Sequence, residues 1–125
     1  MKRKVFGSVL ILLIWVGISL VCAETIPVPD LVGNWTGSSV GHYAGEEGFV
    51  DEEAFSYRFF VENQVDRAFH GTLYETGIHG DKSYPFSGVI GPDMKTLYMA
   101  DHDKGYNTGF FIEPDTMELI LLVDG

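Results

Sequence analysis

The sequence predicts an all-β domain, an antiparallel up-and-down meander that curls into a small barrel, either closed or incomplete. Two tight-turn signals, Pro92-Asp93 and Pro114-Asp115, each separate two hydrophobic segments, as in a β-hairpin. Segments with alternating apolar and polar residues recur at intervals of about 10 residues, a spacing typical of sandwiches and barrels. After residue 23 no stretch has the apolar periodicity and caps of a helix, so almost no helix is expected there.

Residues 1–23 have the pattern of an export signal. Lys2, Arg3 and Lys4 precede an uncharged apolar run, and Val21-Cys22-Ala23 ends in the small-residue pattern that signal peptidase recognises. We expect this segment to be helical and to be cleaved after Ala23. The alternative is an uncleaved membrane anchor, because an apolar run of this length can just span a bilayer. Either way, the protein is predicted to be secreted or associated with the cell envelope.

The domain that follows is predicted to contain seven strands. Residues 24–30 include Pro27 and Pro29 and are expected to form an extended linker, followed by one domain over residues 31–125. The first strand is followed by a long acidic loop, and Asn63–Asp66 is expected to be a turn. Short connections favour up-and-down order over a Greek key. The expected strands are Leu31–Val40, Ala54–Glu62, Ala68–Glu75, Tyr84–Ile90, Thr96–Ala100, Asn107–Ile112 and Met117–Val123.

The last strand raises the question of barrel closure. Alternate residues from Met117 onward are expected to face the core, yet Ile120 and Leu122 on the opposite face are also apolar. Two apolar faces imply cover on both sides. A meander barrel of this size usually closes with about eight strands. Either the last strand is absent from this chain, and Met117–Val123 is an exposed edge, or the first strand closes a seven-stranded sheet.

Two resemblances add to this interpretation. Gly33-Asn34-Trp35 opens the first strand, and Gly-x-Trp at this place resembles the lipocalin and avidin superfamily of meander barrels. In that superfamily the Trp plugs the closed end of the barrel. Four segments, Leu31–Gly37, Phe86–Gly91, Lys95–Tyr106 and Asp115–Gly125, resemble a group of uncharacterised secreted proteins of methanogenic archaea. Members of that group usually continue with another strand, whereas this chain stops. The resemblance implies the fold and export, and no activity.

Charge excludes one class of partner. The chain carries 18 Asp and Glu against 8 Lys and Arg, a formal net charge of −10. Such an acidic surface repels phosphate backbones, so nucleic-acid binding is not expected. Contact with a membrane is expected only through the N-terminal segment, if that segment is not cleaved. Solubility is the simplest role of the acidity.

Catalytic and metal-binding patterns are weak. The densest polar cluster, Asp101–Gly105, departs from an EF-hand loop, because its Gly comes one residue early and Ile112 stands where the Glu belongs. A solvated turn is the favoured interpretation. The four histidines lack the spacing of zinc ligands. We therefore predict that the protein is not an enzyme and has no cofactor and no bound metal.

Two functions remain open. The first is a non-enzymatic barrel that binds a small apolar ligand in its mouth, although packing in the core is the stronger expectation for Trp35. The second is a structural or protein-interaction domain of the cell envelope, in which an exposed sheet edge accepts a partner strand or forms a homodimer. The ligand-binding candidates are Trp35, Tyr57, Phe59, Tyr74 and Tyr98.

Overall fold

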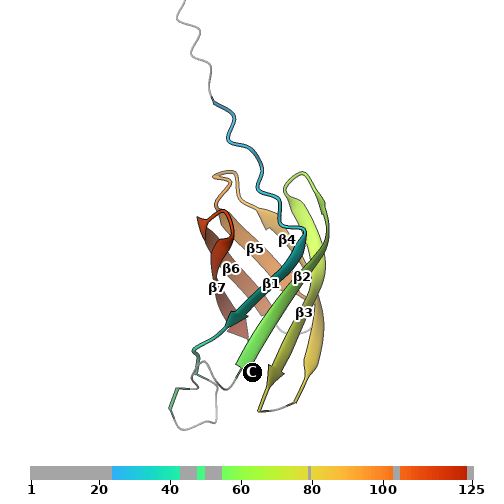
Figure 1. Cartoon of the computed structure of the whole chain (residues 1–125), viewed down its shortest axis with the longest axis vertical. Coiled ribbons are helices and arrows are strands. Elements are labelled where there is room, and N and C mark those ends of the chain that lie inside the picture. The colour runs from blue at the N-terminus through green and yellow to red at the C-terminus, as the bar shows by residue number, and fades with distance from the viewer. Residues whose placement is uncertain (1–23, 43–47, 50–54, 79, 103–104, 124–125) are drawn as a thin grey trace, which may run out of the picture.

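The computed structural model describes residues 24–42, 48–49, 55–78, 80–102 and 105–123, which form a single antiparallel sheet. Its strands follow one another in sequence order, and the sheet curls into a half-barrel (Figure 1). β1 and β7 are the two edges of the sheet and do not pair with each other. The strands are β1 (Gly33–Ser38), β2 (Phe55–Val65), β3 (Ala68–Gly77), β4 (Lys82–Ile90), β5 (Thr96–Asp101), β6 (Gly105–Glu113) and β7 (Thr116–Val123).

The up-and-down meander is confirmed, and all seven predicted strands are present in the described residues. The signal helix predicted for residues 1–23 lies outside the described residues, as does most of the acidic loop. Within the described part of the chain, no helix is long and apolar enough to cross a membrane. Of the two alternatives for closure, pairing of the first strand with the last does not occur in the described sheet, because β1 pairs only with β2.

The turn predicted at Asn63–Asp66 begins later, at Asp66. β2 continues to Val65, and the hairpin tip lies at Asp66, whose φ of 53° is in the left-handed region. A bulge between Val61 and Asn63 shifts the register with β3 by one residue. The bulge accommodates one extra residue in β2, so that the polar residues Asn63 and Gln64 still pair with β3 beyond it.

The core lies on the concave face of the sheet. Alternate residues of β2 are buried, and the inward residues of β3, β4 and β5 join them in one cluster. Phe86 contacts Phe59 and Phe69 edge to face, with ring centroids 5.7 Å and 6.2 Å apart. The buried apolar residues are Leu31, Phe55, Tyr57, Phe59, Val61, Phe69, Leu73, Phe86, Ile90, Leu97 and Met99.

The segment before β1 crosses one end of the half-barrel and is held there by hydrogen bonds. Leu31, only 1% exposed, donates its N–H to Gln64 Oε1 at 2.8 Å. Gln64 Nε2 in turn donates to the carbonyl of Pro29 at 2.8 Å. Val28 packs against the core, so the end of the predicted linker contacts the domain. One glutamine side chain thus joins this segment to the β2–β3 hairpin.

Gly71 allows β2 and β3 to approach closely beside the bulge. A Cβ at this buried position would overlap the carbonyl oxygen of Phe60 and lie 3.0 Å from Cα of Val61. Because the obstacle is backbone, neither strand can yield without loss of register. Gly71→Ala should therefore lower the free energy of unfolding by about 1–3 kcal/mol or more, measured by urea denaturation. Gly37→Ala is the control, since no atom lies within 4 Å of its Cβ position. Equal stabilities of the two variants would contradict this account.

Asp93 orders the turn between β4 and β5. Its Oδ2 accepts the hydroxyl of Thr96, and its Oδ1 accepts the N–H groups of Thr96 at 2.9 Å and Lys95 at 3.0 Å. These bonds, that of the Thr96 hydroxyl above all, lower the pKa of Asp93 to about 2. Met94, which lies between Asp93 and Lys95 in the turn, has a backbone φ of 56°, in the left-handed region. The carboxylate therefore stabilises a turn whose backbone is locally unfavourable.

The lowered pKa makes this turn sensitive to acid. A carboxyl with a folded pKa below its unfolded value stabilises the fold above the unfolded value of 3.8, and this stabilisation is lost as pH falls toward about 2. The difference in urea midpoint between the wild type and Asp93→Ala should therefore be constant above pH 5 and shrink below pH 4. The Asn side chain does not titrate, so the difference in urea midpoint between Asp93→Asn and Asp93→Ala should be the same at every pH. A pH-independent difference between wild type and Asp93→Ala would refute the assignment.

Candidate functional site

Side chains fill the interior of the half-barrel. Of the five predicted ligand-binding residues, Trp35, Tyr57 and Phe59 point inward, and Tyr57 and Phe59 belong to the buried core. The cavity that remains beside Trp35 and Phe59 has a volume of about 10 Å³. A cavity of this size holds at most about one water molecule. A small ligand could enter this part of the barrel only by displacing core side chains.

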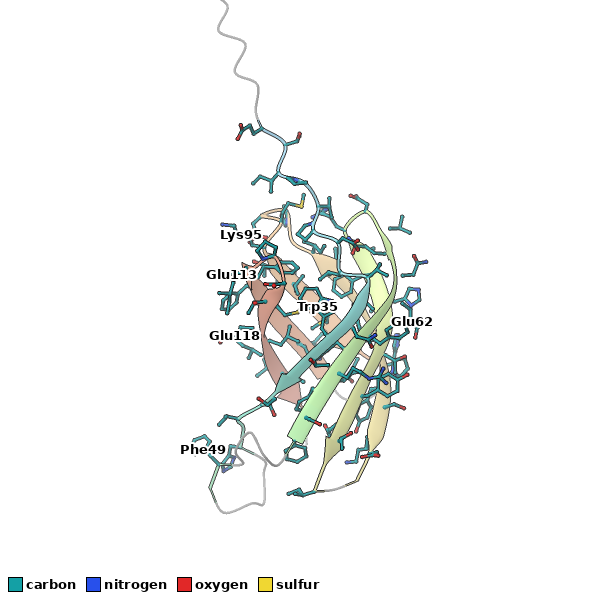
Figure 2. All side chains as sticks on the ribbon, in the orientation of Figure 1. Trp35, Phe49, Glu62, Lys95, Glu113 and Glu118 are labelled. Carbon is teal, nitrogen blue, oxygen red and sulfur yellow. The ribbon has the colours of Figure 1, made fainter. Side chains whose placement is uncertain are left out.

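Trp35 spans the open side of the sheet. Its ring meets that of Phe111 on β6 edge to face, with centroids 6.2 Å apart, and its indole N–H donates to the carbonyl of Leu31 at 2.8 Å. Met117 and Leu119 of β7 line the same small cavity. Figure 2 shows Trp35 within the curl of the sheet, between β1 and the strands behind it. Side chains, and not backbone hydrogen bonds, therefore hold the two ends of the sheet together.

Tyr74 and Tyr98 lie on the convex, outer face. The guanidinium of Arg58 lies 4.0 Å from the centre of the Tyr74 ring and donates to Asn34 Oδ1 at 3.2 Å. Tyr98 is 52% exposed and lies on β5, two strands beyond Tyr74 in the sheet order. The five predicted residues are therefore divided between two faces and do not form one site.

The outer face of β4 to β7 is unusually apolar. Val89, Tyr98, Thr108 and Ile120 are successive register partners and form one row across four strands. A neighbouring row pairs Tyr106 with Leu122. By contrast, the outer face of β2 and β3 carries polar residues such as Arg58, Glu62, His70 and Thr72. We call the exposed residues of the first region the apolar outer face: Val89, Tyr98, Tyr106, Phe110, Ile120 and Leu122.

The apolar outer face ends at the free edge of β7. Contiguous apolar surface rimmed by polar residues marks interaction sites in soluble proteins. Edge strands are usually protected by Pro, Lys or internal bulges. β7 has none of these, and its one charged residue is Glu118. Figure 2 places Glu118 beside β7, with Glu113 near the turn that precedes it.

The direction of the backbone groups along β7 follows from a hydrogen bond on the far side of β6. Phe111 donates its N–H to the carbonyl of Lys95 at 3.0 Å, toward β5. Backbone groups of successive residues in an antiparallel strand point to opposite sides. The backbone N–H and C=O groups of Phe110 therefore point toward β7, where the register partner of Phe110 is Glu118. By the same alternation, the N–H and C=O groups of Leu119 and Leu121 point away from β6, toward the free edge.

Two other polar features are weaker candidates. Arg58, Tyr74, Glu75 and Lys82 line a shallow hollow near the start of β4, but Arg58 is engaged by Tyr74 and Glu75 lies opposite Lys82 in the register. Ser87 Oγ and His102 Nε2 lie 3.4 Å apart on the exposed surface. Among the described residues no three His, Cys, Asp or Glu side chains gather as metal ligands.

Comparisons with protein-family models, with curated proteins and with solved structures found no match. The resemblances to meander barrels and to archaeal secreted proteins therefore stay predictions.

The apolar outer face was only partly visible in the sequence. Ile120 and Leu122 stood out because they interrupt a solvent-facing pattern in β7. Tyr98 was predicted as a ligand-binding residue, and no separate signal in the sequence marked Tyr106 or Phe110. Only the register shows that they lie on adjacent strands, in neighbouring rows.

Asn107 is the one buried polar side chain in the described core. It is 4% exposed, lies opposite Met99 and Leu121, and its Oδ1 has no hydrogen-bond partner among the described residues. An unsatisfied buried carbonyl costs about 1–3 kcal/mol. Leu has the same branching and the same number of side-chain heavy atoms as Asn, so Asn107→Leu should raise the free energy of unfolding by about 1 kcal/mol, measured by urea denaturation.

The neighbouring Thr108 provides a control of opposite sign. Its hydroxyl donates to the carbonyl of Leu97 at 3.1 Å, so Thr108→Val should lower stability by about 0.5–1.5 kcal/mol. Destabilisation by Asn107→Leu would instead show that its amide makes a bond that holds the core.

Proposed function

We propose that this protein is a non-enzymatic interaction domain that binds an extended polypeptide strand at the free edge of β7. The observation that carries the proposal is the coincidence of an unprotected edge with apolar residues on both faces of β7. Strand addition uses these two features: the edge supplies main-chain hydrogen bonds, and alternate side chains contact apolar surface. Export to the cell envelope, inferred from residues 1–23, would place the domain among other polypeptides outside the cell.

The state of the edge residues supports this function. Leu119 and Leu121 lie on the inner face but are only half-buried, and β7 is an edge strand of the sheet formed by the described residues. Ile120 and Leu122, on the outer face, are 46% and 63% exposed. An added strand would cover both pairs and would satisfy the outward backbone groups of Leu119 and Leu121.

The geometry favours this function over a small apolar ligand within the barrel. The cavity beside Trp35 is about 10 Å³, far below the ~300 Å³ of a typical ligand pocket. Tyr74 and Tyr98, which the ligand hypothesis also needs, lie outside the barrel. The edge, in contrast, needs no rearrangement to accept a strand.

A labelled peptide copying residues 116–123, flanked by lysines for solubility, tests strand addition. We expect saturable binding to the full chain at a concentration where the chain is monomeric, measured by fluorescence anisotropy. A peptide N-methylated at the residues corresponding to Leu119 and Leu121 should not bind, because it lacks the N–H groups that face the edge. Methylation at the Ile120 and Leu122 positions should be tolerated.

The methylated peptides separate strand addition from apolar adhesion, since they keep all side chains. Equal binding by both methylated peptides, or failure of the parent peptide to bind, would contradict the proposed function.

A further inference from the structure

We propose that the strand bound at this edge is β7 of a second copy of the chain, paired antiparallel about a two-fold axis through Ile120. The inference rests on the proposed function, because it names the occupant of the same edge. A two-fold arrangement presents the same surface twice and closes on itself as a dimer.

The register follows from the direction of the backbone groups. Since Leu119 and Leu121 direct their N–H and C=O groups outward, they must form the hydrogen-bonded pairs of any added antiparallel strand. With the axis through Ile120, Leu119 of one copy lies opposite Leu121 of the other. This register overlaps the strand from Met117 to Val123 in full, whereas a shift of the axis along β7 shortens the overlap.

Charge is compatible with the same register. Each copy carries a formal net charge of −10, so like-charge contacts at an interface between copies would be costly. The one charged residue of β7, Glu118, then lies opposite Leu122 of the second copy. An axis through Glu118 would instead place two carboxylates face to face.

Packing also improves on both faces of β7. Ile120 lies opposite its own symmetry mate as a non-hydrogen-bonded pair, the type in which side chains approach most closely. The row of Val89, Tyr98, Thr108 and Ile120 then continues into the same row of the second copy. On the inner face, half-buried Leu119 gains Leu121 of the second copy as a neighbour.

The other edge is a poorer partner for β7. β1 spans only Gly33–Ser38, includes two glycines and presents Asn34 and Thr36 on its outer face. Polar side chains there would not extend the apolar outer face. Pairing of β7 with β1 of another copy would also be head to tail, and so would produce rings or open chains and not a two-fold dimer.

Cysteine cross-linking tests the register. In a full chain carrying Cys22→Ser, Ile120→Cys should form a disulfide-linked dimer under mild oxidation, because Cα atoms of a non-hydrogen-bonded pair are ~4.5 Å apart, within disulfide range. Leu122→Cys is the matched control: it lies opposite Glu118 of the second copy, so its own mate is too distant to bond. Cross-linking at both positions alike, or at neither, would overturn the register.

Lysine substitutions test the same pairing without oxidation, by light scattering across a concentration series. Ile120→Lys places two ammonium groups together on the axis and should weaken dimerisation about tenfold or more. Leu122→Lys, although equally charged, places Lys opposite Glu118 of the second copy and should not weaken it. A wild-type chain that stays monomeric at high concentration would overturn self-pairing. If the β7 peptide nevertheless binds, the edge still accepts a strand and the proposed function stands.

Discussion

The contact of Trp35 with Phe111 is the interaction on which the shape of this half-barrel depends. β1 and β7 share no backbone hydrogen bonds, so nothing in the sheet itself fixes the distance between its two edges. The indole packs across that opening, and its N–H is fixed by the carbonyl of Leu31 at 2.8 Å. Leu31 is held by Gln64, on the β2–β3 hairpin. A chain of side-chain contacts thus replaces the ladder that closes an ordinary barrel.

This mode of closure explains why the edge of β7 stays available. A backbone ladder between β1 and β7 would satisfy the outward groups of Leu119 and Leu121. Side-chain closure buries apolar surface inside the curl and leaves those groups directed toward the free edge. The glycines at positions 71 and 109 serve the same compact curl, since a Cβ at Gly109 would lie 2.6 Å from the carbonyl oxygen of Glu118. Close packing of the inner face and an open edge are therefore consequences of one arrangement.

The sequence predicted the meander well because its signals are local. Pro92-Asp93 and Pro114-Asp115 mark turns through residues that adopt turn conformations themselves, and alternation in β2 depends only on neighbours in the chain. The bulge at Val61 was not predictable, because it depends on the pairing of β2 with β3. The division of Tyr57 from Tyr74 between faces follows from strand parity, yet the ligand hypothesis grouped them by residue type. The apolar outer face needed the register of four strands, which no single segment contains.

The acidic residues and the apolar outer face lie on different parts of the surface. Among the described residues, the charges lie mainly in turns and on the outer face of β2 and β3, whereas the outer face from β4 to β7 is largely uncharged. A protein of net charge −10 repels its own copies at long range, but this repulsion is screened over roughly 8–10 Å at physiological salt. Pairing at β7 acts within that distance and involves one carboxylate per copy. Long-range repulsion therefore limits unspecific aggregation, while a defined register at the edge remains accessible to a strand that fits it.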